Sequence, residues 1–146
     1  MKNLLLALSS TVLFFSCGGP SDPELTCDAA PAAATLSTNV QAVIEAKCSK
    51  ACHLAGDTYG DYTTAAKTGE VVNKLSLYAG TNKTMKVVDP KNLANSSLWL
   101  KVLGGAGKGR TGPNGENVFG AMPNDGTSLS AEQKKILKDW ICGGAK

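Results

Sequence analysis

The chain has 146 residues, with 15 basic and 12 acidic side chains and a formal charge of +3, a length that suits one domain. This charge is too small, and the basic residues are too dispersed, to predict a nucleic-acid-binding protein. Five cysteines and a single histidine are the residues that carry most of the functional information.

The N-terminus has the features of an export signal. A short basic start at residues 1–3 precedes an apolar run over residues 4–15. This run has the length of a signal-peptide core and is too short to span a bilayer comfortably. Ser16-Cys17 resembles the end of a bacterial lipobox, where the peptide is cut before a cysteine that then carries lipid. We therefore expect residues 1–16 to be removed and Cys17 to be lipidated. The alternative is an ordinary secretory signal cut nearby, which leaves Cys17 unmodified.

Two regions follow the signal. Residues 17–34 are rich in Gly, Pro, Ala and Ser and predict a flexible tether, with an arm packed on the domain as the alternative. Residues 35–146 are expected to form the folded domain. Within it, residues 104–120 contain seven glycines and predict a long irregular loop. The loop includes a GxGxxG pattern at residues 107–112, but no strand leads into it and no helix opens from it, so a nucleotide site is excluded.

Apolar spacing and capping signals predict the helices of the domain. The first covers residues 38–47, a short one is possible at 63–67, and another runs over 97–103 after Asn95 or Ser96. A final helix follows the capping box of Ser130 and Gln133, contains Trp140 as a core residue, and ends at Gly143-Gly144. The segment 71–78 fits a short helix or a strand equally well, and 87–90 is extended because it leads into a proline.

The most informative motif is Cys48-Ser49-Lys50-Ala51-Cys52-His53. Two cysteines followed directly by a histidine are the arrangement that attaches a c-type haem, since each thiol can add to one vinyl group and the imidazole can bind the iron. Three residues separate these cysteines, where two are usual. The extra residue must bulge outward if both thiols are to form thioethers.

The remaining cysteines can be assigned by counting. If Cys17 carries lipid and Cys48 and Cys52 carry haem, then Cys27 and Cys142 are left as disulfide partners in an oxidising compartment. A second disulfide between Cys48 and Cys52, with the same outer pair, is the competing assignment.

Several stretches together give the chain a resemblance to small class I mono-haem cytochrome c domains, in particular those of exported bacterial lipoproteins. The resemblance covers residues 40–145 and rests on a helix leading into the cysteine motif, on Val87-Val88-Asp89-Pro90 before Ser96-Ser97-Leu98-Trp99, on Ala121-Met122-Pro123, and on a closing helix that ends Trp140-Ile141-Cys142-Gly143-Gly144-Ala145. The family implies an all-α fold of three to five helices packed around one covalently bound haem, with long glycine-rich loops.

The resemblance also assigns ligands. His53 corresponds to the proximal iron ligand, and Met122, the methionine before a proline, corresponds to the distal one, with Met85 as the reserve candidate. Filling both axial positions leaves no site for substrate, so the resemblance implies an electron carrier and not an enzyme. Peroxidase-type activity becomes credible only if Met122 does not bind iron. We expect a monomer with haem c as its cofactor, a partner redox protein, a lipid tether to a bacterial membrane, and a periplasmic or cell-surface location.

Two other classes of function stay open at this stage. Cys48, Cys52 and His53 could bind copper or zinc, because thiolate and imidazole suit both metals. Alternatively, the chain could be a structural lipoprotein with two disulfides and no cofactor.

Overall fold

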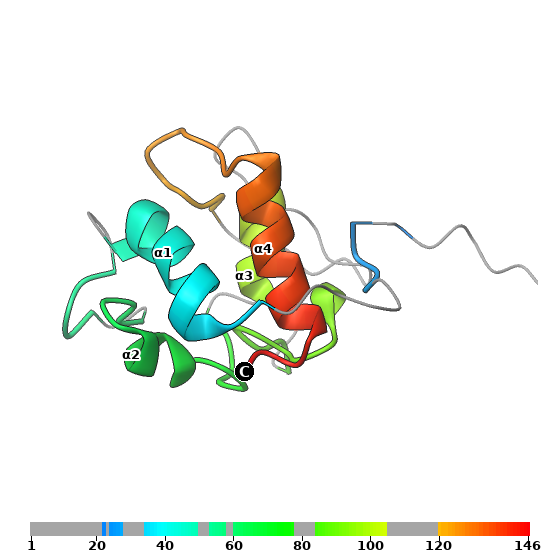
Figure 1. Ribbon diagram of the computed structural model, residues 1–146, viewed down its shortest axis with the longest axis horizontal. Coiled ribbons are helices and arrows are strands. Elements are labelled where there is room, and N and C mark those ends of the chain that lie inside the picture. Colours follow the sequence, from blue (N-terminus) through cyan, green and yellow to red (C-terminus); the bar gives the residue numbers. More distant parts are fainter. Residues whose placement is uncertain are drawn as a thin grey trace, which may run out of the picture.

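The computed structural model describes residues 22, 24–27, 34–49, 53–57, 60–77, 84–104 and 120–146. Every regular element in these ranges is helical and none is a β-strand, which confirms the predicted all-α class (Figure 1). The predicted signal, Cys17, Cys52 and most of the glycine-rich loop lie outside the described residues. No helix in the described part has both the length and the apolarity needed to cross a bilayer.

The first helical segment runs without a break from Leu36 to Ser49. It consists of a π-helical turn η1 (Leu36–Val40), one α-helical turn α1 (Gln41–Ile44) and a second π-helical turn η2 (Glu45–Ser49). The segment begins earlier than predicted, where the Leu36 N–H donates to the carbonyl of Lys146 at 3.0 Å and ties the helix start to the chain end. Its buried apolar residues are those that the helical spacing predicted: Val40, Val43 and Ile44.

The short helix α2 (Ala65–Gly69) begins two positions later than expected. Asp61 accepts hydrogen bonds from both the backbone N–H and the hydroxyl of Thr63, at 2.9 and 2.6 Å, and these bonds hold Thr63 in a turn. Such local side-chain contacts compete with helical geometry. Thr64 is therefore the N-cap, and its hydroxyl oxygen accepts from the Lys67 N–H at 3.2 Å.

A buried polar contact joins α2 to the first segment. The Thr68 hydroxyl donates to Gln41 Oε1 at 2.8 Å, and Gln41 Nε2 donates to the Tyr62 carbonyl at 3.0 Å. Both Thr68 and Gln41 are buried, and their mutual hydrogen bond offsets the cost of removing them from water. The contact fixes the backbone at Tyr62, whose side chain lines a large cavity of the protein.

The chain between α2 and the next helix is irregular. The segment that could have been either a helix or a strand is neither in its described part, over residues 71–77. Isolated bridges pair Val72 with Val88 and Leu75 with Lys86, without extending into strands.

Helix α3 (Ser97–Leu103) is buried on almost every side and follows the single turn η3 (Leu93–Asn95). Ser96 occupies the predicted N-cap position but makes no capping bond. Its hydroxyl instead donates to the Asn92 carbonyl at 2.8 Å, and its oxygen is 2.9 Å from the Asp89 N–H, which donates to it. The loop before α3 thus takes the polar group that the helix end would otherwise use. Gly104 ends the helix as predicted.

Helix α4 (Ala131–Cys142) forms as the sequence predicts. Both halves of the capping box are present, with Ser130 and Gln133 bonded reciprocally at 3.1 and 2.9 Å. Trp140 is completely buried in the core, and its indole N–H donates to the Lys146 carbonyl at 3.2 Å. Gly143 ends the helix.

The N-terminal arm is joined to the domain by a disulfide, by a hydrogen bond and by Leu25, which packs against the core. Cys27 and Cys142 form the predicted disulfide, with 5.4 Å between their Cα atoms. The Trp99 indole N–H donates to the Glu24 carbonyl at 2.7 Å. Glu24 and Cys27, both within the segment predicted as a tether, are therefore part of the packed structure.

The disulfide should contribute strongly to stability, because it closes a loop of 115 residues. The chain-entropy model gives about 4 to 5 kcal/mol for a loop of this length. We expect the double variant Cys27→Ser/Cys142→Ser to unfold at a clearly lower urea concentration than the wild type. Reductant should lower the wild-type midpoint and leave that of the variant unchanged. Equal wild-type midpoints with and without reductant would contradict the prediction.

A carboxylate before α3 should control stability in acid. Asp89 accepts from Lys86 Nζ and Asn95 Nδ2, both at 2.8 Å, and from Asn92 Nδ2 at 3.1 Å. Burial raises the pKa of Asp89, but these hydrogen bonds outweigh it and hold the pKa below its ordinary value of 3.8. Because the folded-state pKa is depressed, the stabilisation is complete above the unfolded-state pKa and is lost as the pH falls through the folded-state pKa.

The variant Asp89→Asn should therefore unfold more easily than the wild type at pH 7, by about 1 to 3 kcal/mol. The difference should shrink as the pH falls below 3.8. Urea titrations of both proteins across the acid range measure it. A gap that stays constant down to full protonation would show that the Asp89 charge does not act as described.

Candidate functional site

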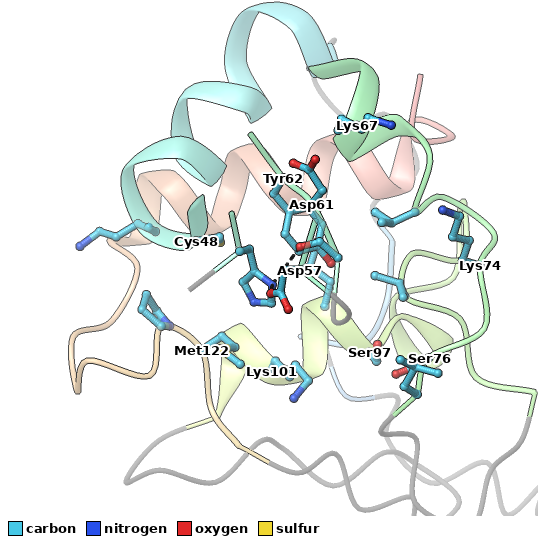
Figure 2. A pocket seen from close by; sticks show the side chains of 18 of the residues that line it. Cys48, Asp57, Asp61, Tyr62, Lys67, Lys74, Ser76, Ser97, Lys101 and Met122 are labelled. Atoms are coloured by element: carbon cyan, nitrogen blue, oxygen red, sulfur yellow. Dashed lines mark hydrogen bonds and ion pairs between the residues drawn. The ribbon is translucent and has the colours of Figure 1, made fainter. Parts of the chain in front are cut away.

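A cavity of about 950 Å³ lies between the first helical segment, α3 and the loop that precedes α4. Its lining is mainly apolar, and its volume falls at the upper end of the range for ligand and cofactor pockets. Figure 2 shows Met122 and Lys101 on the α3 side of this pocket and Cys48, Asp57 and Tyr62 on the side of the first segment. The described candidates from the haem motif and the Met-Pro pair all line it: Cys48, His53 and Met122.

The first helical segment positions Cys48 and, through it, His53. Cys48 is half-buried in the last turn, η2, and its carbonyl accepts from the His53 N–H at 3.2 Å. This bond keeps His53 close to Cys48, and both residues lie in the wall of the same cavity. Cys52 lies outside the described residues, so the attachment of both cysteines stays a prediction.

The His53 imidazole is oriented by the loop that follows it. Its Nδ1 lies 3.2 Å from the Gly60 carbonyl and 3.2 Å from Asp57 Oδ2. Since a carbonyl only accepts, the hydrogen bond to Gly60 requires the proton on Nδ1, and Nε2 of the neutral ring then carries the lone pair. The ring also packs edge-on against Tyr62, with 4.8 Å between centroids and 79° between planes. The side chain of His53 is only 13 % exposed.

A histidine that binds a metal usually donates its other ring N–H to an acceptor, and no sequence motif identifies this acceptor for His53. Gly60 provides it from a backbone conformation with φ +126°, which few residues other than glycine adopt. The signals in the sequence were a glycine seven positions after the histidine and an aspartate four positions after it. Neither signal is specific, because glycines and aspartates are common in any turn.

The loop before α4 holds Met122 against α3. The Met122 N–H donates to the Lys101 carbonyl at 3.2 Å, and Lys101 Nζ donates to the Gly120 carbonyl at 3.3 Å. Two contacts from one α3 residue thus fix the backbone on both sides of Ala121. The reserve candidate, Met85, is fully buried in the core, packs in a small cluster with Leu100, and does not line the cavity.

Burial sets the electrostatics of the cavity wall. Burial raises the pKa of Tyr62 to about 12, with smaller contributions from Cys48 and Asp57, so the phenol is neutral at physiological pH. Burial also lowers the pKa of Lys101 below its usual value. On the exposed side, hydrogen bonds from Thr63 lower the pKa of Asp61, which keeps that carboxylate ionised.

Among the described residues that line the cavity, the nitrogen and sulfur donors suited to a haem are the His53 imidazole, the Met122 thioether and the Cys48 thiol, and four carboxylates line it as well. Within the described ranges, no three His, Cys, Asp or Glu side chains gather in a way that could hold a bare metal ion. An imidazole and a thioether are, however, a known axial pair for haem iron, and both line a cavity whose volume and mainly apolar lining suit a large flat apolar group. The residues present therefore fit a haem.

Comparisons with known proteins identify no relative. No protein-family model, no curated protein sequence and no solved structure matches the chain.

The glycine that orients His53 gives a direct test of this geometry. A Cβ atom at Gly60 would lie 3.1 Å from ring atoms of Tyr62, in a backbone conformation that is strained for alanine. We expect Gly60→Ala to lower the free energy of unfolding by about 1 to 3 kcal/mol. Urea denaturation provides the measurement.

Gly126→Ala is the matched control. Gly126 also has a positive φ, of +78°, but nothing lies within 4 Å of the Cβ position. This variant carries backbone strain without a steric contact and should lose less stability than Gly60→Ala. Equal losses would mean that the added Cβ at residue 60 meets no resistance from the Tyr62 ring and that backbone strain alone accounts for the loss.

Proposed function

We propose that this protein is an electron carrier with one covalently bound c-type haem, axially bound by His53 and Met122. The observation that carries the proposal is that these two residues, far apart in the sequence, line one large and mainly apolar cavity. Specific hydrogen bonds hold both residues at the cavity wall. His53 is held by the turn after η2, and Met122 is held by hydrogen bonds to α3.

Each residue has a defined part in this proposal. Cys48 and Cys52 would form the thioethers, and Cys48 already lies beside His53 at the end of the first helical segment. When bound, the haem iron supplies a one-electron redox couple, and a methionine ligand raises its potential relative to harder donors. His53 would present Nε2 to the iron, because its Nδ1–H is directed at the Gly60 carbonyl. The mainly apolar lining would favour contact with the porphyrin.

A carrier is favoured over a catalyst because the two donors would occupy both axial positions of a bound haem. Catalysis at a haem needs an open distal position and usually polar distal groups. In this cavity the distal candidate is a thioether, and its backbone is anchored to Lys101. A peroxidase-type role would be credible only if Met122 does not bind the iron.

The cellular setting forms part of the same proposal. The N-terminal signal and Cys17 support export and a lipid tether to a bacterial membrane, facing the periplasm or the cell exterior. The Cys27–Cys142 disulfide agrees with an oxidising compartment, where such bonds form and persist. Electrons would be exchanged with a partner redox protein.

The primary experiment is production of the full chain in a host that exports proteins and attaches haem. The mature protein should show a Soret band, give a positive pyridine haemochrome assay, and have an intact mass that includes one haem and an N-terminal lipid. A colourless folded protein with four oxidised cysteines would replace the proposal with a structural lipoprotein. Stoichiometric copper or zinc without haem would replace it with a soft-metal-binding module.

The assignment of Met122 can be tested separately. Met122→Leu should abolish the sulfur-to-iron charge-transfer band of the ferric protein and lower the reduction potential, because the thioether is lost while the volume is nearly kept. Met85→Leu is the matched control, since Met85 is buried away from the cavity, and it should keep the band. Loss of the band in Met85→Leu alone would reverse the assignment of the distal ligand.

A further inference from the structure

The carboxylate of Asp57 has no role in the ligand set, yet it lies against the proximal candidate. Asp57 Oδ2 is 3.2 Å from His53 Nδ1, the same distance that separates this nitrogen from the Gly60 carbonyl. The imidazole nitrogen is thus hydrogen-bonded to the neutral carbonyl oxygen, and the carboxylate oxygen lies at ion-pair distance from the same nitrogen.

The backbone of the loop fixes the position of Asp57. Its N–H donates to the Leu54 carbonyl at 3.0 Å, and its own carbonyl accepts from the Gly60 N–H at 3.2 Å. Gly60, whose carbonyl accepts from His53, therefore also holds the backbone of Asp57 in place. Figure 2 shows Asp57 among the side chains that point into the pocket.

The surroundings of the pair keep its interaction strong. The side chains of His53 and Asp57 are only 13 % and 18 % exposed, and the Oδ2 atom itself is buried. Charges removed from water are screened much less than charges on the surface. A carboxylate beside the non-ligating nitrogen of a metal-binding histidine fixes the tautomer and ring orientation and makes the ligand more basic.

We propose that Asp57 is a positioning residue for His53, which holds the Nδ1-protonated imidazole together with the Gly60 carbonyl and makes Nε2 a stronger donor to the bound iron. The inference rests on the proposed haem ligation. Its consequence is a lower reduction potential than the neutral carbonyl alone would give, because a negative charge near the ligand and a more basic imidazole both favour the oxidised, more positive iron.

The test is the reduction potential of the holoprotein at pH 7, measured for the wild type and Asp57→Asn. At the wild-type midpoint potential, the variant should show a ratio of reduced to oxidised protein at least tenfold higher. For a one-electron couple this corresponds to a rise in potential of about 59 mV. Asp57→Glu, which keeps the charge, should stay closer to the wild type than Asp57→Asn does.

Asp61→Asn is the control for an unspecific charge effect. Asp61 also lines the cavity, but its carboxylate is bonded to Thr63. This variant should change the ratio by less than threefold. Equal shifts in Asp57→Asn and Asp61→Asn, or an unchanged potential in Asp57→Asn, would overturn the proposal while leaving the haem ligation intact.

A second measurement does not depend on any variant. His53 is the only histidine of the chain, so its ring N–H can be assigned without ambiguity in the reduced, diamagnetic holoprotein. We expect a single Nδ1 proton that exchanges slowly with water, and faster exchange in Asp57→Asn. If Asp57→Asn binds no haem, slow exchange in the wild type together with haem binding by Asp57→Glu still supports the proposal. Rapid exchange in the wild type overturns it, and a wild type without haem overturns the proposed function as well.

Discussion

The burial of α3 is the constraint on which the rest of the structure depends. At its N-terminus, the N–H groups of Ser97 and Leu98 donate to the carbonyls of Lys86 and Val87 in the irregular segment. Its C-terminal half holds the Met122 loop through Lys101, and Trp99 holds the N-terminal arm. A seven-residue helix is marginal in isolation, so α3 is stabilised by packing and in turn fixes three separate segments around it. Through the bond from Met122 to Lys101, α3 also keeps Met122 at the cavity wall.

Local signals in the sequence predicted the elements that local interactions determine. The capping box at Ser130 is a contact within four residues, and α4 accordingly begins where expected. Counting the cysteines predicted the pairing of Cys27 with Cys142, because the chemistry of an oxidising compartment restricts the choices. The helix at 63–67 was displaced because Asp61 and Thr63 form a competing turn, and Ser96 was diverted from capping by Asp89 and Asn92. These are contacts whose geometry the pattern of apolar residues does not encode.

The sequence named His53 and Met122, which the structure places in one cavity wall, but it did not name the residues that contact His53. His53 and Met122 could be named because the motif and the Met-Pro pair are specific in combination. Of the two methionines, Met122 lines the cavity and Met85 fills the core beside Leu100. The Gly60 carbonyl and Asp57 were beyond prediction, because the first depends on a left-handed backbone angle and the second on how a tight loop turns. Such features are set by the loop as a whole and leave no distinctive pattern of residue types.

The main core and the cavity wall share residues, so what fills the cavity affects the stability of the fold. The main core cluster gathers Val40, Ile44, Trp99, Trp140 and Ile141, and the Cys27–Cys142 disulfide is packed with it. Protein interiors are otherwise close-packed, and an empty apolar volume forfeits the dispersion contacts of every atom in its wall. A flat apolar cofactor would restore those contacts to residues such as Leu98 and Tyr62, which belong to both the core cluster and the cavity wall. In the proposed function, binding of the cofactor and stability of the fold are therefore coupled through the residues that these two regions share.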